Sequence, residues 1–463
     1  MRPGRRRRRL AAMTTQVDIP RPSAAPPSPS AESPSLGLPG ATALVVGSIV
    51  GVGIFNLPTS LAGYGPITLI SLGLTTIGAL ALAVLFASLS RRMPADGGPY
   101  AYARAAFGDL LGFANAWSYW ITAWAGNAAI AVGWVLYVQV FVNTGGAKLW
   151  SILLVLGGLW FAALVNLSGV RNTGAFQVAT TILKFAALAF VSVVGLFYVK
   201  SANFSPFNVG GGSAVSAIGG GMAIALFSYL GVETAAVVAA KVRDPDRNVP
   251  RATILGTLAT AVVYLLSLVA VFGIVPAGKL ADTSAPFSTA VDAMFGGTVW
   301  GKVMAAVVIV SGIGALNGWT LVTAEMPLAA ARDGVFPRRF GELSRRGVPA
   351  FGIVASTVLA SLAVVVNYLG ADGETVFTTL VLMTGITAAI PYGFSALAQI
   401  KWGVTEGPRL ARDLVVAVLA LVFSILFIVY SRDTGHGFWV YWAPFFLTAG
   451  ALALGVPVYR TRR

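Results

Sequence analysis

Runs of apolar residues follow one another along most of the chain and are separated by short polar segments. A helix needs about 20 apolar residues to cross the hydrocarbon of a bilayer. The third and eighth runs are longer than an upright helix requires, so we expect these two helices to tilt or to extend into water. The pattern predicts twelve spans, at residues 41–62, 67–90, 110–142, 150–169, 174–199, 215–240, 252–276, 297–330, 350–370, 374–400, 413–430 and 438–458.

The first predicted span contains a segment that opposes a continuous helix. This segment, GSIVGVGIFNLP at residues 47–58, carries three glycines within seven positions and ends at Pro58. Each glycine costs a helix about 1 kcal/mol relative to alanine. Backbone that is unwound at mid-membrane depth must be buried in protein or line a watery cavity, because lipid cannot satisfy its polar groups. The alternative interpretation is that the glycines only permit close helix packing.

The sixth predicted span is interrupted in a similar way, at Ser228-Tyr229-Leu230-Gly231, which is followed by Glu233. Interrupted first and sixth spans stand at corresponding positions of two five-span halves, which indicates an inverted-repeat transporter with a site at the bilayer midplane. Free N–H groups of one half-helix suit an anion and free carbonyls of the other suit a cation, so a zwitterionic amino acid suits both. The predicted fold is an all-α integral membrane protein with twelve transmembrane helices, a five-plus-five inverted repeat and discontinuous helices 1 and 6.

Composition supports a membrane protein, since 56% of the 463 residues are hydrophobic and only 11% are charged, against about 25% charged in soluble domains. There is no cysteine, and the one histidine, His436, is predicted to lie in a loop. Disulfides, thiolate sites and histidine metal clusters are thereby excluded, and we expect no metal and no cofactor. A membrane enzyme would need an acid–base or nucleophile cluster that the chain lacks, whereas a non-transporting sensor of the same fold is harder to exclude.

The net charge of +15 is explained by topology rather than by a nucleic-acid partner. With the N-terminus inside, cytoplasmic segments hold 26 of the 32 Lys and Arg residues and outer segments hold five. The positive-inside rule therefore predicts a multi-pass protein of the cell membrane with both termini cytoplasmic. Residues 1–36 are predicted to be a disordered basic, Pro/Ser-rich tail that attracts anionic lipid, unless Met13 is the true start. Residues 37–463 are predicted to form the transporter domain.

Three ionisable residues fall within predicted spans: Lys184, Glu233 and Glu325. A charge at mid-bilayer is costly and usually functional. Lys184 has no acidic residue within four positions, so its partner must lie on another span. Burial disfavours its charged form, which would let it exchange a proton; the alternative is an ammonium that only bridges backbone carbonyls. The role of Glu325 stays open, because it lies near the cytoplasmic end of its span.

Four motifs carry a resemblance that covers nearly all of the chain from about residue 40. They are GSIVGVGIF, GGPYAYARAAFG at 97–108, FSYLGVETA followed by VRDPDRNVPRATI, and GWTLVTAEMPLAAARDGVFP at 318–337. In these the sequence resembles the amino acid–polyamine–organocation superfamily, and most closely its basic amino acid/polyamine antiporters, such as the arginine–agmatine antiporter. The resemblance implies twelve spans, a homodimer and alternating access.

The resemblance also implies roles for individual residues. The substrate carboxylate is expected on the backbone N–H groups of Val52 and Gly53, and the amino group on carbonyls of Ile49, Phe227 and Leu230. Phe227 replaces a tryptophan lid, and Val52 replaces a serine. Trp319 is expected to stack on the cationic side chain of the substrate. Asn127 and Thr384 are expected near the far end of that substrate side chain. Tyr119, Glu233 and Tyr392 match the gate nearest the cytoplasm.

Lys184 departs from the antiporter pattern. Proton-coupled permeases of the superfamily carry a lysine there, where its ammonium stands in for a sodium ion. The sequence therefore predicts a sodium-independent transporter of cationic or polar amino acids, proton-linked through Lys184. Transport of polyamines, or exchange of an amino acid against an amine, is the alternative.

Overall fold

The computed structural model describes residues 36–93, 97–169, 173–237, 239, 242–405, 411–432 and 438–461. The predicted tail before residue 36 and His436 lie outside these residues. Within them the regular structure is helical, with no strand and one isolated bridge between Leu36 and Val242. The prediction of an all-α protein is thereby confirmed for the part of the chain that is described.

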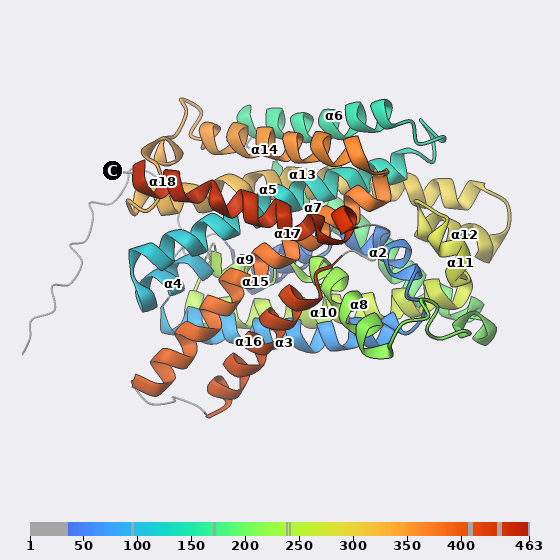
Figure 1. The fold of residues 1–463 in the computed structure, drawn as a ribbon, viewed down its shortest axis with the longest axis horizontal. Coiled ribbons are helices and arrows are strands. Elements are labelled where there is room, and N and C mark those ends of the chain that lie inside the picture. The colour runs from blue at the N-terminus through green and yellow to red at the C-terminus, as the bar shows by residue number, and fades with distance from the viewer. Residues whose placement is uncertain are drawn as a thin grey trace, which may run out of the picture. The chain divides into compact units, whose positions relative to one another are not determined.

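The α-helices are numbered in chain order (Figure 1). They are α1 (Leu38–Ile49), α2 (Gly53–Ala62), α3 (Thr68–Arg92), α4 (Pro99–Phe107), α5 (Asp109–Val138), α6 (Lys148–Leu167), α7 (Thr173–Val194), α8 (Ala214–Leu226), α9 (Thr234–Val237), α10 (Pro245–Ile274), α11 (Ala277–Ala281), α12 (Pro286–Phe295), α13 (Val299–Arg332), α14 (Ala350–Gly370), α15 (Gly373–Thr405), α16 (Ala411–Tyr430), α17 (Phe438–Ala453) and α18 (Gly455–Thr461). Short 3-10 turns include Gly195–Tyr198 after α7 and Phe227–Tyr229 after α8.

Eleven segments of the described chain are long and apolar enough to cross a membrane. The sixth predicted span, at 215–240, is instead a shorter apolar helix, Ala214–Tyr229, followed by α9. The two spans predicted to be overlong are long helices, since α5 has 30 residues and α13 has 34. Apolar run length therefore located eleven of the twelve predicted spans, although α5 ends at Val138 rather than at residue 142.

Both predicted interruptions are present. α1 ends at Ile49 and α2 begins at Gly53, so the first span consists of two helices joined by an irregular segment. In the sixth, α8 gives way to the 3-10 turn Phe227–Tyr229, and α9 begins only at Thr234. The glycine-rich composition of these stretches favours such breaks, because glycine stabilises a helix poorly.

Three short helices were not predicted: α4, α11 and α12. They have five to ten residues, too few for the apolar run by which spans are recognised. α4 corresponds to the GGPYAYARAAFG motif. Its ends are set by Gly97, Gly98 and Gly108, which have φ values of +94°, +48° and +85° that other residues rarely adopt.

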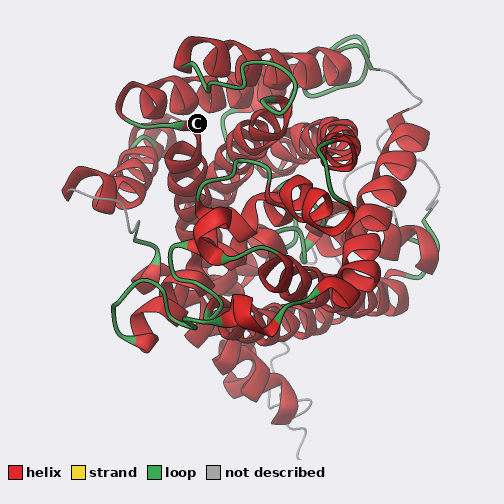
Figure 2. Ribbon diagram, turned by 90° about the vertical axis from the view of Figure 1, so that its right-hand side faces the viewer, coloured by secondary structure: helices red, strands yellow, loops and turns green. Residues whose placement is uncertain are grey.

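Helices α5 and α15 form the centre of the described bundle. In α5, 94% of the most apolar window is buried, against 17% in the segment that contains α17. α5 packs on α15, α13 and α4, while α1 packs on α10. Several long helices are seen almost end-on in the second view (Figure 2), which shows that they run in similar directions. The central pair α5 and α15 also contacts the two interruptions.

Candidate functional site

Two glycines allow the interruptions to touch each other. Gly231 has a φ of +101°, and a Cβ at this position would lie 2.9 Å from the carbonyl carbon of Ser48. A Cβ at Gly53 would lie 2.6 Å from the Cδ1 atom of Phe227. The backbone of each break therefore approaches the other at a distance that leaves no space for a side chain. Only glycine fits both positions without displacement of its neighbours.

Side chains from other helices bond the carbonyls at the end of α1. In a continuous helix the Gly47 carbonyl would accept from the N–H of Gly51, but that N–H donates to Ile49 instead, at 2.8 Å. The ammonium of Lys184, on α7, donates to the Gly47 carbonyl at 2.7 Å. The hydroxyl of Tyr264, on α10, donates to the Ile49 carbonyl at 3.0 Å. Polar side chains thus satisfy the carbonyl groups that the break leaves without helical partners, so these groups are not exposed to lipid.

Lys184 is 1% exposed, and its partner lies on another span, as the sequence predicts. Among the described residues, no carboxylate forms an ion pair with it. Its ammonium is therefore held by a backbone carbonyl at the discontinuity, which places a titratable group directly on the interrupted helix. The predicted proton exchange is not tested by this geometry.

A small cavity lies where the interruptions meet. It is lined by Ser48, Ile49, Gly51, Gly53, Thr122, Gly126, Ile130, Phe227, Ser228, Leu230 and Trp319. Its volume of about 20 Å³ admits a water molecule, which needs about 10–15 Å³. An amino acid is larger, so its entry requires side chains such as Phe227 to move. In this conformation the cavity is therefore too small to hold an amino acid.

Five of the eight residues predicted to bind substrate line the cavity: Ile49, Gly53, Phe227, Leu230 and Trp319. The Ile49 carbonyl already accepts bonds from Gly51 and Tyr264. A carbonyl has two acceptor lone pairs, so an amino group could bind there only after one of these donors turns away.

The other three, Val52, Asn127 and Thr384, are not among the lining residues. Asn127 donates from Nδ2 to the Thr320 hydroxyl of α13 at 3.0 Å, and its buried Oδ1 has no hydrogen-bond partner. The Thr384 hydroxyl donates within its own helix, to Leu380. Both therefore lie beside the cavity rather than in it in this conformation.

Sequence reasoning missed six lining residues, among them Thr122, Gly126 and Ile130 on one face of α5. Their spacing of four residues is a detectable helical signal. It was obscured because small and apolar residues occur on every face of this helix. Ser228 was also missed; its buried hydroxyl oxygen has no hydrogen-bond partner.

Glu233 lies immediately before α9 and is 1% exposed. The Tyr119 hydroxyl, from α5, donates to one carboxylate oxygen at 2.7 Å, and the Tyr392 hydroxyl, from α15, donates to the other at 2.8 Å. The structure brings together the three residues predicted to form the inner gate. Their role as a gate stays a prediction, but the arrangement joins the second interruption to the two central helices.

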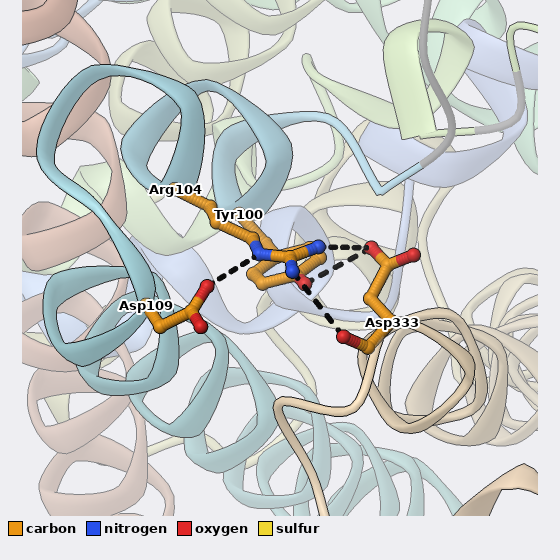
Figure 3. A network of polar contacts seen from close by, with 4 residues as sticks. All are labelled: Tyr100, Arg104, Asp109 and Asp333. Atoms are coloured by element: carbon orange, nitrogen blue, oxygen red, sulfur yellow. Dashed lines mark hydrogen bonds and ion pairs between the residues drawn. The ribbon is translucent and has the colours of Figure 1, made fainter. Parts of the chain in front are cut away.

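A second polar network joins α4 to Asp109 and Asp333 (Figure 3). Asp333, directly after α13, accepts a hydrogen bond from the Tyr100 hydroxyl at 3.0 Å and pairs with the Arg104 guanidinium at 3.2 Å. Arg104 also donates to Asp109 at 2.9 Å. Burial, and next the Asp333 carboxylate, raise the pKa of Tyr100 above its usual range, so its hydroxyl remains a donor. This network fixes α4 against the end of α13.

Comparison with known proteins gives a consistent result. The amino acid permease family matches residues 36–450. The putrescine transporter PotE of Haemophilus influenzae is 32% identical over 405 residues, which are 86% of this chain and 92% of that protein. The arginine/ornithine antiporter of Pseudomonas aeruginosa is 30% identical, with 85% of each chain covered. The cadaverine/lysine antiporter of Escherichia coli is 28% identical, with 84% of this chain and 88% of that protein covered.

Proposed function

Because the chain belongs to the amino acid permease family, and is thus a multi-pass membrane transporter rather than an enzyme, we propose that it carries cationic or polar amino acids without sodium. The relatives' names supply the substrate classes: arginine, ornithine, lysine, cadaverine and putrescine. Polyamine transport, or exchange of an amino acid against its amine, is the second candidate. It is favoured by the putrescine transporters among the relatives.

The observation that carries the proposal is the contact between the two interruptions at a small cavity. The amide N–H groups of Val52 and Gly53 begin α2, where partial positive charge attracts a carboxylate. Carbonyls of Phe227 and Leu230 can accept from an α-amino group. The twelfth crossing, the five-plus-five repeat, the cytoplasmic termini and a homodimer complete the proposed architecture, in which one half-bundle moves relative to the other.

Competition in proteoliposomes tests which substrate class is carried. Uptake of radiolabelled ornithine in sodium-free buffer is measured against an excess of arginine, lysine, putrescine or cadaverine. If the site holds a carboxylate on α2, the amino acids compete more strongly than their decarboxylated products. Stronger competition by the diamines would favour the polyamine transporter, and a strict requirement for sodium would contradict both proposals.

Trp319 is the proposed contact for the cationic end of the substrate. Its replacement by leucine removes the aromatic face, and a cation–π contact contributes about 0.5–2 kcal/mol. We expect Trp319→Leu to weaken ornithine binding roughly two- to thirtyfold and to affect small neutral amino acids less. Trp124→Leu is the matched control, since Trp124 is buried on α5 but does not line the cavity. Equal losses for cationic and neutral ligands would remove the stacking argument.

A further inference from the structure

The two glycines directly before α4, Gly97 and Gly98, contact α9, the short helix that follows Glu233. The N–H of Gly97 donates to the carbonyl of Val237, the last residue of α9, at 3.2 Å. A Cβ at Gly98 would lie 3.1 Å from Cγ2 of Val237 and 3.5 Å from its Cα. The glycines at the start of α4 therefore place its backbone directly against that of α9.

Val237 is in turn bonded to the gate residue. Its N–H donates to the Glu233 carbonyl at 3.1 Å, within one helical turn. Since α9 has only four residues, a displacement of Val237 displaces Glu233 with it. The start of α4 and the Glu233 carboxylate are thus linked through one short rigid segment.

The rest of α4 is fixed to two long helices. Tyr100 and Arg104 hold Asp333 at the end of α13 (Figure 3). At the other end of α4, the ammonium of Lys401 on α15 donates to the Ala106 carbonyl at 2.5 Å. A backbone movement that carries Glu233 away from Tyr119 and Tyr392 therefore requires either that α9 separates from the glycines before α4 or that α4 moves and its contacts with α13 and α15 break.

We propose that Asp333, Tyr100 and Arg104 are positioning residues for the inner gate: by holding α4 they hold α9, and with it Glu233, in the closed position. This inference rests on the proposed role of Glu233 as a gate. Asp333 is 233 positions away from Tyr100 in the sequence, so its contacts join two segments that are distant in the chain. The Arg104–Asp109 pair, by contrast, joins α4 to the start of α5, which follows it directly in the chain.

Access to the cavity from the side of the membrane that α4 faces is the most direct test. The chain has no cysteine, so Ser228→Cys places a single thiol in the cavity lining. The rate at which a membrane-impermeant thiol reagent modifies it, applied from that side of the membrane, reports gate opening. In this background Asp333→Asn replaces a charged acceptor by a neutral one, and we expect a roughly tenfold faster modification. Tyr100→Phe should act in the same direction, whereas Asp109→Asn should change the rate less than about threefold, as for an exposed ion pair.

Tyr392→Phe separates failure of this inference from failure of the proposed gate. If Tyr392→Phe leaves modification unchanged, Glu233 does not gate the cavity and the inference fails with it. If Tyr392→Phe accelerates modification but Asp333→Asn does not, only the positioning role is wrong. If both roles are correct, the double variant Tyr392→Phe/Asp333→Asn increases the modification rate by less than the product of the two single increases, because either substitution alone already opens the gate. A lower melting temperature for Asp333→Asn at an unchanged modification rate would show that the network serves only to dock α4.

Discussion

Substitution of Gly231 by alanine is expected to abolish substrate binding and uptake. At φ +101° an alanine costs about 1–3 kcal/mol in backbone strain. Its Cβ would also meet backbone atoms of Ser48 at 2.9–3.0 Å. Because backbone cannot rotate away like a flexible side chain, the two interruptions must move apart, which displaces the groups that line the cavity between them. Uptake and ornithine binding by purified protein measure the effect.

Gly63→Ala is the control for this variant. Gly63 follows α2, has a φ of −62°, and has open space where a Cβ would lie. The Gly63→Ala variant should therefore keep the uptake rate and the melting temperature of the unaltered protein. Gly53→Ala separates folding from function, since its Cβ would meet the Phe227 ring, which can turn; we expect a folded protein with impaired binding. Normal transport by Gly231→Ala would show that contact between the interruptions is not needed.

Lys184→Met is expected to remove the response of uptake to an imposed pH gradient. Methionine keeps most of the side-chain length but cannot carry a proton or donate to the Gly47 carbonyl. Loss of that donor leaves a buried carbonyl without its partner, which destabilises the protein by about 1–3 kcal/mol. Uptake in proteoliposomes with and without a pH gradient, together with the melting temperature, measures both effects.

Lys302→Met provides the matched control, because Lys302 is an exposed lysine at the start of α13. Uptake by the Lys302→Met variant should respond to the pH gradient as uptake by the unaltered protein does. If uptake by Lys184→Met still responds fully to the pH gradient, Lys184 has only a structural role in the unaltered protein. Uptake driven by a sodium gradient would contradict the proposal that Lys184 stands in for a sodium ion.

The interruptions could be predicted because glycine and proline act locally on helix stability. Gly47, Gly51 and Gly53 weaken the first span whatever surrounds it, and the structure breaks the helix between Ile49 and Gly53. The isolation of Lys184 from acidic neighbours likewise predicted a partner on another span. Its identity, the Gly47 carbonyl, depends on how α7 packs against α1 and leaves no mark in either segment.

Contacts between distant segments account for what the sequence did not predict. The cluster around Glu233 could be proposed only through a family resemblance, since its tyrosines are 114 and 159 positions away. The network at Asp333 was missed although both of its motifs were recognised, because nothing in either motif points to the other. Asn127 was expected near the substrate, but it bonds Thr320 in this conformation, and a sequence does not specify one conformational state.

A cryo-electron microscopy structure of the protein with ornithine bound tests the central claim most directly. The account predicts density between the two interruptions, with the carboxylate on the N–H groups of Val52 and Gly53, the α-amino group on carbonyls of Phe227 and Leu230, and the side chain against Trp319. It also predicts that Phe227 moves to make room. Ornithine bound away from this cavity, or continuous first and sixth helices, would contradict the account.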